Sequence, residues 1–573
     1  MSAGAADPRA AATRAPDAAG RRWWNARQIA LAAAGACAVA AMAFLFRFNA
    51  LGSSLGGFDN DHFIYLVRAD SLLAGEQPLR DFADAELRGA WPALTYAVSA
   101  WAQQLGGRTL LSEAYLAVGL LALAHALVFV LALDLSRRWS VALVATAVAV
   151  TTVPKLYNYP KVLALALGLW LVRASALRPT PVRLGLAALV TAAAGLFRHD
   201  LGIYVAGAVI AALLARDPDR WRLAARHAAV YVALTVVCLL PSAVWIQVYE
   251  GLPQYVRDAA ATVAAEQART NLRLPPLDPS APFARSNLEV VTYYVFWAVP
   301  VVAGAVLLGR LASRHGPRPT RDARATAIGL LVMTVFVNMS FLRANLAERF
   351  GDGVVAVVLL AAWVAGAAPL WTSTIVRRTV VAAPIALLVV ALGTSSVLSE
   401  VARELDTGGL SDSWEETVRR YRAVRDELAR VPPAVWTDAD AVGTLRAARY
   451  VAECTGPDDR VLGIGPVHEI HVFARRRFAA GQAMFKLSLY TSEAFQRRAL
   501  ERLSRESVPV VIADIEELGY FDEQYPLVSR YLAARYRDAG VITVDDRPRF
   551  RVLVAVDRKA ARMDARLGLP CFV

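Results

Sequence analysis

Long apolar blocks constrain this chain more than any other feature of its sequence. Runs of Ala, Leu and Val recur along residues 29–398 and approach the length of about 20 residues that crosses a bilayer as a helix. A soluble core would distribute the same residues as periodic stripes along amphipathic elements. The chain is 56% hydrophobic, with a mean hydropathy of +0.39, which is more apolar than soluble domains normally are. The sequence therefore predicts a polytopic α-helical membrane protein.

We expect about eleven spans from the length criterion. They cover residues 29–48, 110–133, 140–154, 161–177, 183–197, 202–215, 228–248, 289–309, 326–342, 353–371 and 379–398. Residues 1–28 precede the first span, and most of them are Ala, Pro, Arg and Asp without periodicity, a composition that cannot bury a core. The first block is too long for a signal peptide and lacks a small-residue cleavage pattern, so we expect an anchor after a disordered cytoplasmic tail.

The positive charge is distributed in a way that predicts topology. The net charge is +13, but Lys and Arg gather in short loops between apolar blocks, where they orient helices toward the cytoplasm. The basic loops lie at residues 21–27, 137–138, 178–183, 216–226, 310–324 and 377–378. Every second loop is basic, so an odd number of spans places the C-terminal part outside the cytoplasm. We expect a plasma-membrane protein in contact with membrane lipids, and no nucleic-acid partner.

Residues 399–573 change character and predict a soluble extracytoplasmic α/β domain. The segments 460–465 and 508–513 read as buried strands between charged helical stretches, and 540–544 with 550–555 as an antiparallel pair. Among the four cysteines, only Cys454 and Cys571 lie outside apolar blocks and are candidates to pair. His468 and His471 have no accompanying ligand motif, and we interpret them as surface histidines.

The long loop at residues 49–109 holds the first candidate site. Asp59, Asp61 and His62 precede a helical pattern over residues 63–73, which predicts an amphipathic helix along the membrane surface. One reading is that the two acids only cap that helix. In the other, one acid is a general base that takes a proton from an acceptor hydroxyl. His62 and the acids could also hold a divalent cation such as Mg²⁺ or Mn²⁺, although their spacing matches no metal motif.

Cations in the other far-side loops form the second candidate site, because they oppose the orientation rule. They are Lys155, Lys161, Arg198 and Arg343. Ionisable residues at a membrane boundary usually have a functional or pairing reason. Together they could bind a phosphate. Alternatively, each extends to lipid headgroups or pairs with a neighbour such as Asp200 or Glu348.

The first loop also resembles a known family. The segments Asn60-Asp61-His62-Phe63, Leu73-Ala-Gly75, Pro78-Leu-Arg80-Asp81-Phe82 and Ser99-Ala100 resemble the GT-C superfamily, specifically the dolichyl-phosphate-mannose protein mannosyltransferases (PMT, family 39) and their bacterial relatives. In those proteins an acid of the first extracytoplasmic loop is catalytic, and Asp61 matches its position. His62 stands where many members have a second acid, and Asn345 stands in a segment where an Asp and a His are expected.

The resemblance implies an inverting glycosyltransferase that takes sugar from a polyprenyl-phosphate donor and passes it to an extracytoplasmic glycan, lipid or protein. Asp61 would be the base, with Asp59 in reserve, and Lys155, Lys161, Arg198 and Arg343 would bind the donor phosphate. We assign the sugar and acceptor to His62, Arg80, Asp81, His199, Asp200 and Glu348. Two other classes stay open. A secondary transporter or lipid translocase would place charges in mid-span, and a non-catalytic scaffold would use its helices only as an anchor.

Overall fold

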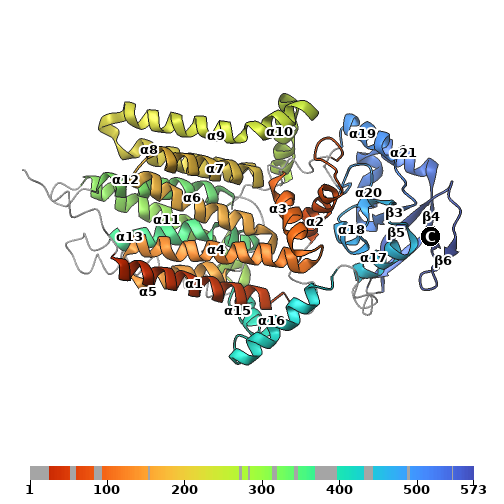
Figure 1. The fold of residues 1–573 in the computed structure, drawn as a ribbon, viewed down its shortest axis with the longest axis horizontal. Coiled ribbons are helices and arrows are strands. Elements are labelled where there is room, and N and C mark those ends of the chain that lie inside the picture. The colour runs from red at the N-terminus through yellow and green to blue at the C-terminus, as the bar shows by residue number, and fades with distance from the viewer. Residues whose placement is uncertain are drawn as a thin grey trace, which may run out of the picture.

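The computed structural model describes residues 25–51, 58, 60–82, 93–152, 155–269, 274–281, 284–312, 319–340, 346–367, 397–431, 443–486, 491–544 and 546–573. Two bodies lie end to end along its longest axis, a helical bundle and a C-terminal domain that contains the sheet (Figure 1). The helices α2 and α3 lie between them.

The bundle confirms a polytopic α-helical membrane protein. Eight of its described helices are long and apolar enough to cross a membrane, and two further apolar helices are shorter. The bundle helices are α1 (Ala26–Asn49), α4 (Leu110–Ser136), α5 (Trp139–Thr151), α6 (Tyr159–Leu177), α7 (Pro181–Phe197), α8 (His199–Arg216), α9 (Trp221–Tyr249), α11 (Arg285–Ala312), α12 (Arg321–Met339) and α13 (Leu346–Ala367). They correspond to ten of the expected spans, and the eleventh falls almost entirely on residues outside the description.

Local sequence accounts for where several of these helices begin. The side chain of Asn25 accepts from the Gln28 N–H at 2.8 Å, while the Gln28 side chain accepts from the Asn25 N–H at 3.0 Å, so two of the free amides at the start of α1 are satisfied. The Thr180 hydroxyl caps α7 by accepting from the Arg183 N–H at 3.4 Å, and proline follows it at the first helical position.

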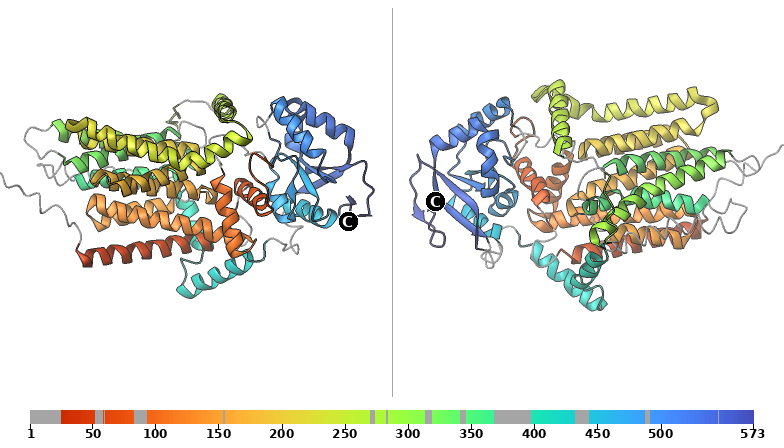
Figure 2. Two further views of the ribbon diagram at one scale, coloured as in Figure 1. Left: turned by 45° about the horizontal axis from the view of Figure 1, so that its top comes forward. Right: turned by 180° about the vertical axis from the view of Figure 1, so that it is seen from behind.

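Three basic loops are described in full, between α4 and α5, between α6 and α7, and between α8 and α9, and they lie at the end of the bundle away from the C-terminal domain (Figure 2). Arg173 near the end of α6 donates to Asp134 near the end of α4 at 2.8 Å. Arg216 at the end of α8 lies 3.5 Å from Asp322 at the start of α12. These pairs hold the loop ends of four helices together.

The expected amphipathic helix forms as α2 (Asn60–Leu73), but its surroundings differ from the prediction. Every residue from His62 to Ala69 is buried, so the helix has no exposed polar face there. It packs on α3 (Leu94–Gly106) and on α18 (His468–Ala474) of the C-terminal domain, with Phe63 and Phe473 ring centroids 5.4 Å apart. The C-terminal domain therefore covers the residues of α2 that the amphipathic pattern predicted to be exposed to solvent.

The C-terminal domain contains a five-stranded mixed sheet of order β2-β1-β3-β5-β4. Its strands are β1 (Arg460–Ile464), β2 (Arg477–Phe478), β3 (Val510–Asp514), β4 (Tyr536–Val544) and β5 (Arg547–Ala555). Strand β1 runs parallel to β2 and β3, while β5 runs antiparallel to β3 and β4. The two predicted buried strands and the predicted antiparallel pair are confirmed.

Helices α17 (Gly443–Cys454), α18, α19 (Glu493–Leu503), α20 (Ile515–Gln524) and α21 (Pro526–Arg535) accompany this sheet, and α15 (Val397–Thr407) and α16 (Trp414–Leu428) lead to it from the bundle. A short hairpin, β6 (Arg562–Met563) with β7 (Pro570–Cys571), ends the chain. One apolar core runs without interruption from the bundle through α2 to Val461, Val510 and Val552 on one face of the sheet. The other face has a separate core that includes Leu462 and Val511.

Candidate functional site

The proposed base, Asp61, lies in the first turn of α2, at the end of the bundle that meets the C-terminal domain. Its side chain is partly exposed, whereas the helical residues that follow it are buried. A carboxylate in the first turn also interacts favourably with the helix dipole. Asp59 lies outside the described residues, so the reserve role assigned to it stays a prediction.

His62 belongs to a buried polar group that the sequence did not reveal. Its Nε2 lies 2.8 Å from Oε1 of Glu113 in the first turn of α4, and both side chains are fully buried. The Ser99 hydroxyl of α3 donates to the same carboxylate oxygen at 2.9 Å. Three helices therefore fix the residue next to Asp61, and His62 faces the protein interior. In this position His62 is better suited to orient the first loop than to contact a soluble sugar directly.

Tyr65 connects α2 to the cation-bearing loops. Its hydroxyl donates to the carbonyl of Tyr157 at 3.4 Å, in the turn that precedes α6 (Leu156–Asn158 is a 3-10 helix). Burial raises the pKa of Tyr65 well above its ordinary value, the nearby Tyr159, Tyr157 and Asp61 add to the rise, and the charge of Arg198 opposes it. Tyr65 therefore lies within electrostatic range of both the proposed base and Arg198.

Lys161 forms a buried ion pair with Asp352. Its Nζ donates to Oδ2 of Asp352 at 2.7 Å, and each side chain is only 9% exposed. Arg349, one turn earlier on α13, lies 3.9 Å from the same oxygen. The second oxygen of Asp352 is buried and accepts no hydrogen bond. The pair joins α6 to α13 and leaves one acceptor and part of one guanidinium unsatisfied.

Arg198 occupies the junction between α7 and α8 and pairs with Asp200. Its Nε and Nη2 donate to the two carboxylate oxygens at 2.8 and 2.5 Å, a two-pronged geometry that suits guanidinium. Burial alone would lower the pKa of Arg198, but the charge and hydrogen bonds of Asp200 more than offset it and raise that pKa. The charge of Asp352 also acts on Arg198, which places the two ion pairs side by side. The side chains of Arg198 and Asp200 remain 22% and 29% exposed.

The other predicted site residues are distributed around this centre. His199 Nε2 lies 3.2 Å from the hydroxyl of Tyr255, at the start of α10 (Leu252–Arg269), and the two rings meet edge to face. Lys155 Nζ lies 5.9 Å from the centre of the Tyr157 ring. Arg343 lies outside the described residues, as does the side chain of Glu348.

Arg80 and Asp81 lie away from the cations, where the first loop meets the C-terminal domain. Arg80 donates to Asp81 at 2.7 Å, and Asp81 also accepts from the Gln77 N–H at 2.8 Å. The carbonyl of Arg80 accepts from Arg502 at 3.2 Å. Desolvation would raise the pKa of Asp81, but the hydrogen bond from Arg80 and its charge lower it. This pair organises a turn and the domain contact.

Sequence reasoning missed Glu113, Asp352, Ser99 and Tyr255. Both acids stand at the start of an apolar block, which is the signal that could have found them, since an acid there needs a partner or a function. The sequence predictions included only boundary cations and the acids close to them in sequence. Glu113 and Asp352 lie far from their partners along the chain, and only the packing of the helices brings each pair together.

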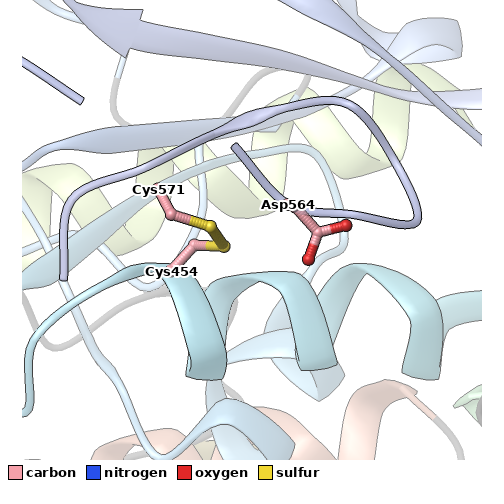
Figure 3. A group of neighbouring side chains, drawn as sticks. All are labelled: Cys454, Asp564 and Cys571. Atoms are coloured by element: carbon pink, nitrogen blue, oxygen red, sulfur yellow. A yellow bond between two sulfur atoms is a disulfide. The ribbon is translucent and has the colours of Figure 1, made fainter. Parts of the chain in front are cut away.

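One group of metal-type ligands occurs among the described residues, and it is not a metal centre. Cys454, Asp564 and Cys571 lie together in the C-terminal domain (Figure 3). The two cysteines are joined by a disulfide, as the sequence suggested, and their sulfurs are therefore not available as thiolate ligands. Asp564 accepts from the N–H groups of Arg566 and Leu567 at 3.0 and 2.7 Å, which accounts for its burial. The divalent cation considered beside His62 stays a prediction.

Comparison with known proteins finds likeness among solved structures. No known family profile matches the sequence, and no curated protein matches it either. Among solved structures, the crystal structure of ArnT from Cupriavidus metallidurans bound to undecaprenyl phosphate is similar, with 15% sequence identity and a TM-score of 0.46. The match covers 92% of this chain and 98% of that one. A likeness at this level assigns no role to any residue of this chain.

Proposed function

We propose that this membrane protein is a GT-C-like glycosyltransferase that transfers a sugar from a polyprenyl-phosphate donor to an acceptor outside the cytoplasm. One observation carries the proposal. Asp61, Lys161 and Arg198 come from three separate parts of the sequence. The charges of Asp61 and Arg198 both act on Tyr65, and the charge of Arg198 also acts on Lys161. A carboxylate beside converging cations at a membrane boundary suits a lipid phosphate and an attacking hydroxyl.

The charge balance of the cation cluster suits the proposed donor. Lys161, Arg198 and Arg349 face the two carboxylates of Asp200 and Asp352, which leaves an excess of one positive charge. A sugar linked through a phosphodiester carries one negative charge. The departing polyprenyl phosphate gains further negative charge as the bond breaks, so the cluster would interact more strongly with the transition state than with the donor.

In the proposed reaction Asp61 takes the proton of the acceptor hydroxyl while the oxygen attacks the anomeric carbon. The new bond joins that oxygen to the sugar, and the bond from the anomeric carbon to the phosphate oxygen breaks with its electron pair on the phosphate. Attack from the face opposite the phosphate inverts the configuration. Arg198 and Lys161 stabilise the departing phosphate, and the buried contact of His62 with Glu113 holds the start of α2 in place.

Two observations support the orientation that the reaction requires. The basic loops that the structure describes in full lie at the end of the bundle opposite Asp61, which favours a cytoplasmic location for that end. The Cys454–Cys571 disulfide of the C-terminal domain is typical of an oxidising compartment. Both support a location outside the cytoplasm for Asp61 and the C-terminal domain, as the proposed reaction requires.

The test is sugar transfer from a panel of radiolabelled polyprenyl-phosphate sugars by membranes that contain the wild type or Asp61→Asn at equal expression. We expect the substitution to lower transfer by a factor of about 100 to 10,000, the usual contribution of a general base. Asp426→Asn, an exposed acid on α16, is the matched control and should retain transfer. Equal transfer by Asp61→Asn and the wild type would contradict the role of Asp61. Absence of transfer with every donor would favour the transporter or scaffold alternatives.

A further inference from the structure

Arg68 is a fully buried arginine whose charge has no counterpart among the described residues. It lies on α2, two turns after Asp61, with 0% exposure. None of its three guanidinium nitrogens makes a hydrogen bond, and its nearest partner is the ring of Tyr96, with 5.9 Å from Cζ to the ring centre. A buried charge without a partner is strongly destabilising, so a guanidinium in this state calls for a missing anion.

Ser71 and His468 are buried polar residues near Arg68. Ser71, one turn later on the same helix, is fully buried and its hydroxyl has no hydrogen-bond partner. The charges that act on His468 are those of Arg68, His471 and Lys486. No carboxylate appears among the groups that influence His468 in the described part of the chain. The junction of α2 and α18 therefore holds the unpaired guanidinium of Arg68 and the unused hydroxyl of Ser71, and the charges of Arg68 and Lys486 both act on His468.

His468 and His471 are not surface residues, which corrects the interpretation of the sequence. They are 0% and 2% exposed and lie on α18, against α2. Burial lowers the pKa of His468 well below its ordinary value, and the charge of Arg68 lowers it further; burial also lowers the pKa of His471 to about 4. Both rings are thus neutral at physiological pH, and a neutral imidazole can still donate one N–H to an anion.

The position of the α18 histidines relative to the sheet also suits a ligand. Strand β1 lies between its parallel neighbours β2 and β3. The chain passes from β1 to β2 on one side and then crosses to β3 on the other side of β1. Ligands of parallel α/β sheets bind outside the carboxyl end of the strand at which the order reverses. His468 follows the carboxyl end of β1. Gly463 lies near that end, and a Cβ atom at this position would lie 3.1 Å from Nε2 of His471.

We propose that Arg68, Ser71 and the α18 histidines form a binding site for an oxyanion of the phosphate class, between the first loop and the C-terminal domain. The site is separate from the cation cluster of Lys161 and Arg198 and does not depend on the proposed transferase activity. A phosphate there accepts hydrogen bonds from the guanidinium and the Ser71 hydroxyl. It joins α2 to α18 and therefore stabilises the docking of the C-terminal domain. Because Arg68 is fully enclosed, a small free anion fits this position better than a lipid headgroup.

Thermal unfolding of the purified full-length protein in lipid nanodiscs tests the site. We compare sodium phosphate and sodium sulfate with sodium chloride at equal ionic strength, for the wild type, Arg68→Met and the control Arg505→Gln, an exposed arginine just after α19. A ligand at about ten times its Kd raises the folding equilibrium constant about tenfold. Phosphate should thus raise the unfolding temperature of the wild type and of Arg505→Gln, but not that of Arg68→Met.

The chloride arm gives a prediction of opposite sign. Without the anion, Arg68→Met should be at least as stable as the wild type, because it removes an uncompensated buried charge. Arg68→Lys keeps a charge but loses the two-pronged geometry, and should retain a reduced response to phosphate. Nanodiscs that contain undecaprenyl phosphate in chloride buffer distinguish the two sources, since protection there, lost in Arg68→Met, would assign the site to a lipid phosphate. The proposal is overturned if no phosphate-containing condition stabilises the wild type, or if Arg68→Met responds equally.

Discussion

The two ends of the bundle use charged residues in different ways. At the basic end, Arg216 donates to the carbonyls of Ala176 and Leu177 and to Asp217, and Arg324 donates to the carbonyls of Ala215 and Arg216. These arginines bind the free carbonyls at helix ends, where cations are favoured.

At the opposite end, cations and acids pair across helices but leave buried polar atoms unused. One oxygen of Asp352, one of Glu113 and the Nε of Arg349 have no hydrogen bond. Arginines that satisfy backbone carbonyls serve the fold, whereas pairs with unused buried atoms keep hydrogen-bonding capacity for a ligand. The comparison shows that the role of a charged residue at the membrane boundary is inferred from whether its hydrogen bonds are satisfied. The presence of the charge alone does not reveal that role.

The largest expected effect comes from Asp352→Asn. This substitution leaves Lys161 as a buried cation without a counter-charge and should destabilise the protein by about 3–5 kcal/mol. Unfolding in nanodiscs measures the loss. The double variant Lys161→Met with Asp352→Leu should recover most of the stability without recovering transfer. A single variant as stable as the wild type would show that the pair is not buried as described.

Arg198→Gln should affect turnover more than stability. The partner Asp200 is 29% exposed and can be hydrated, so the fold loses little. Loss of a charge-compensating donor should lower transfer by a factor of about 100 or more. Transfer rate per folded molecule and unfolding temperature are measured together. A fall in stability that matches the fall in activity would remove the distinction drawn between the two ends.

Arg216→Gln tests the same distinction from the basic end. It removes hydrogen bonds to two carbonyls and to Asp217, and we expect a loss of about 1–3 kcal/mol in stability. Transfer per folded molecule should equal that of the wild type. Selective loss of transfer with normal unfolding would show that the basic end takes part in the reaction.

The smallest effect is expected from Glu76→Gln, at the contact between the first loop and the C-terminal domain. Glu76 pairs with Arg460 and lies 2.8 Å from Arg477, and these partly buried pairs should contribute about 1 kcal/mol to docking. Hydrogen exchange of α18 and β2 should increase while the bundle is unchanged. Unaltered exchange in both elements would mean that apolar packing alone holds the domain.

The sequence predicted the local features of the fold well. Ten expected spans correspond to helices, because apolar runs and caps act over a few residues. The strands around Val461 and Val510 were recognisable as short apolar runs between charged helices. The sequence correctly predicted that α2 is a helix but wrongly predicted that its polar face is exposed. Periodicity cannot show whether a domain several hundred residues later covers that face.

The candidate site divides in the same way. Sequence alone identified Asp61, Lys161 and Arg198, because a charge next to an apolar block is conspicuous in any membrane protein. It could not identify Asp352 as the partner of Lys161, 191 residues away, or Glu113 as the partner of His62. Nor could it distinguish a buried arginine such as Arg68 from one on the surface.

Membrane insertion, helix boundaries and the charge asymmetry of the loops were thus determined by the sequence itself, because hydrophobicity and capping depend on neighbours along the chain. The tertiary structure decided which charges meet, which are satisfied and which remain unused. Those outcomes depend on side-chain contacts between helices and domains that are distant in sequence, and the distances that set an ion pair are fixed only when the helices pack.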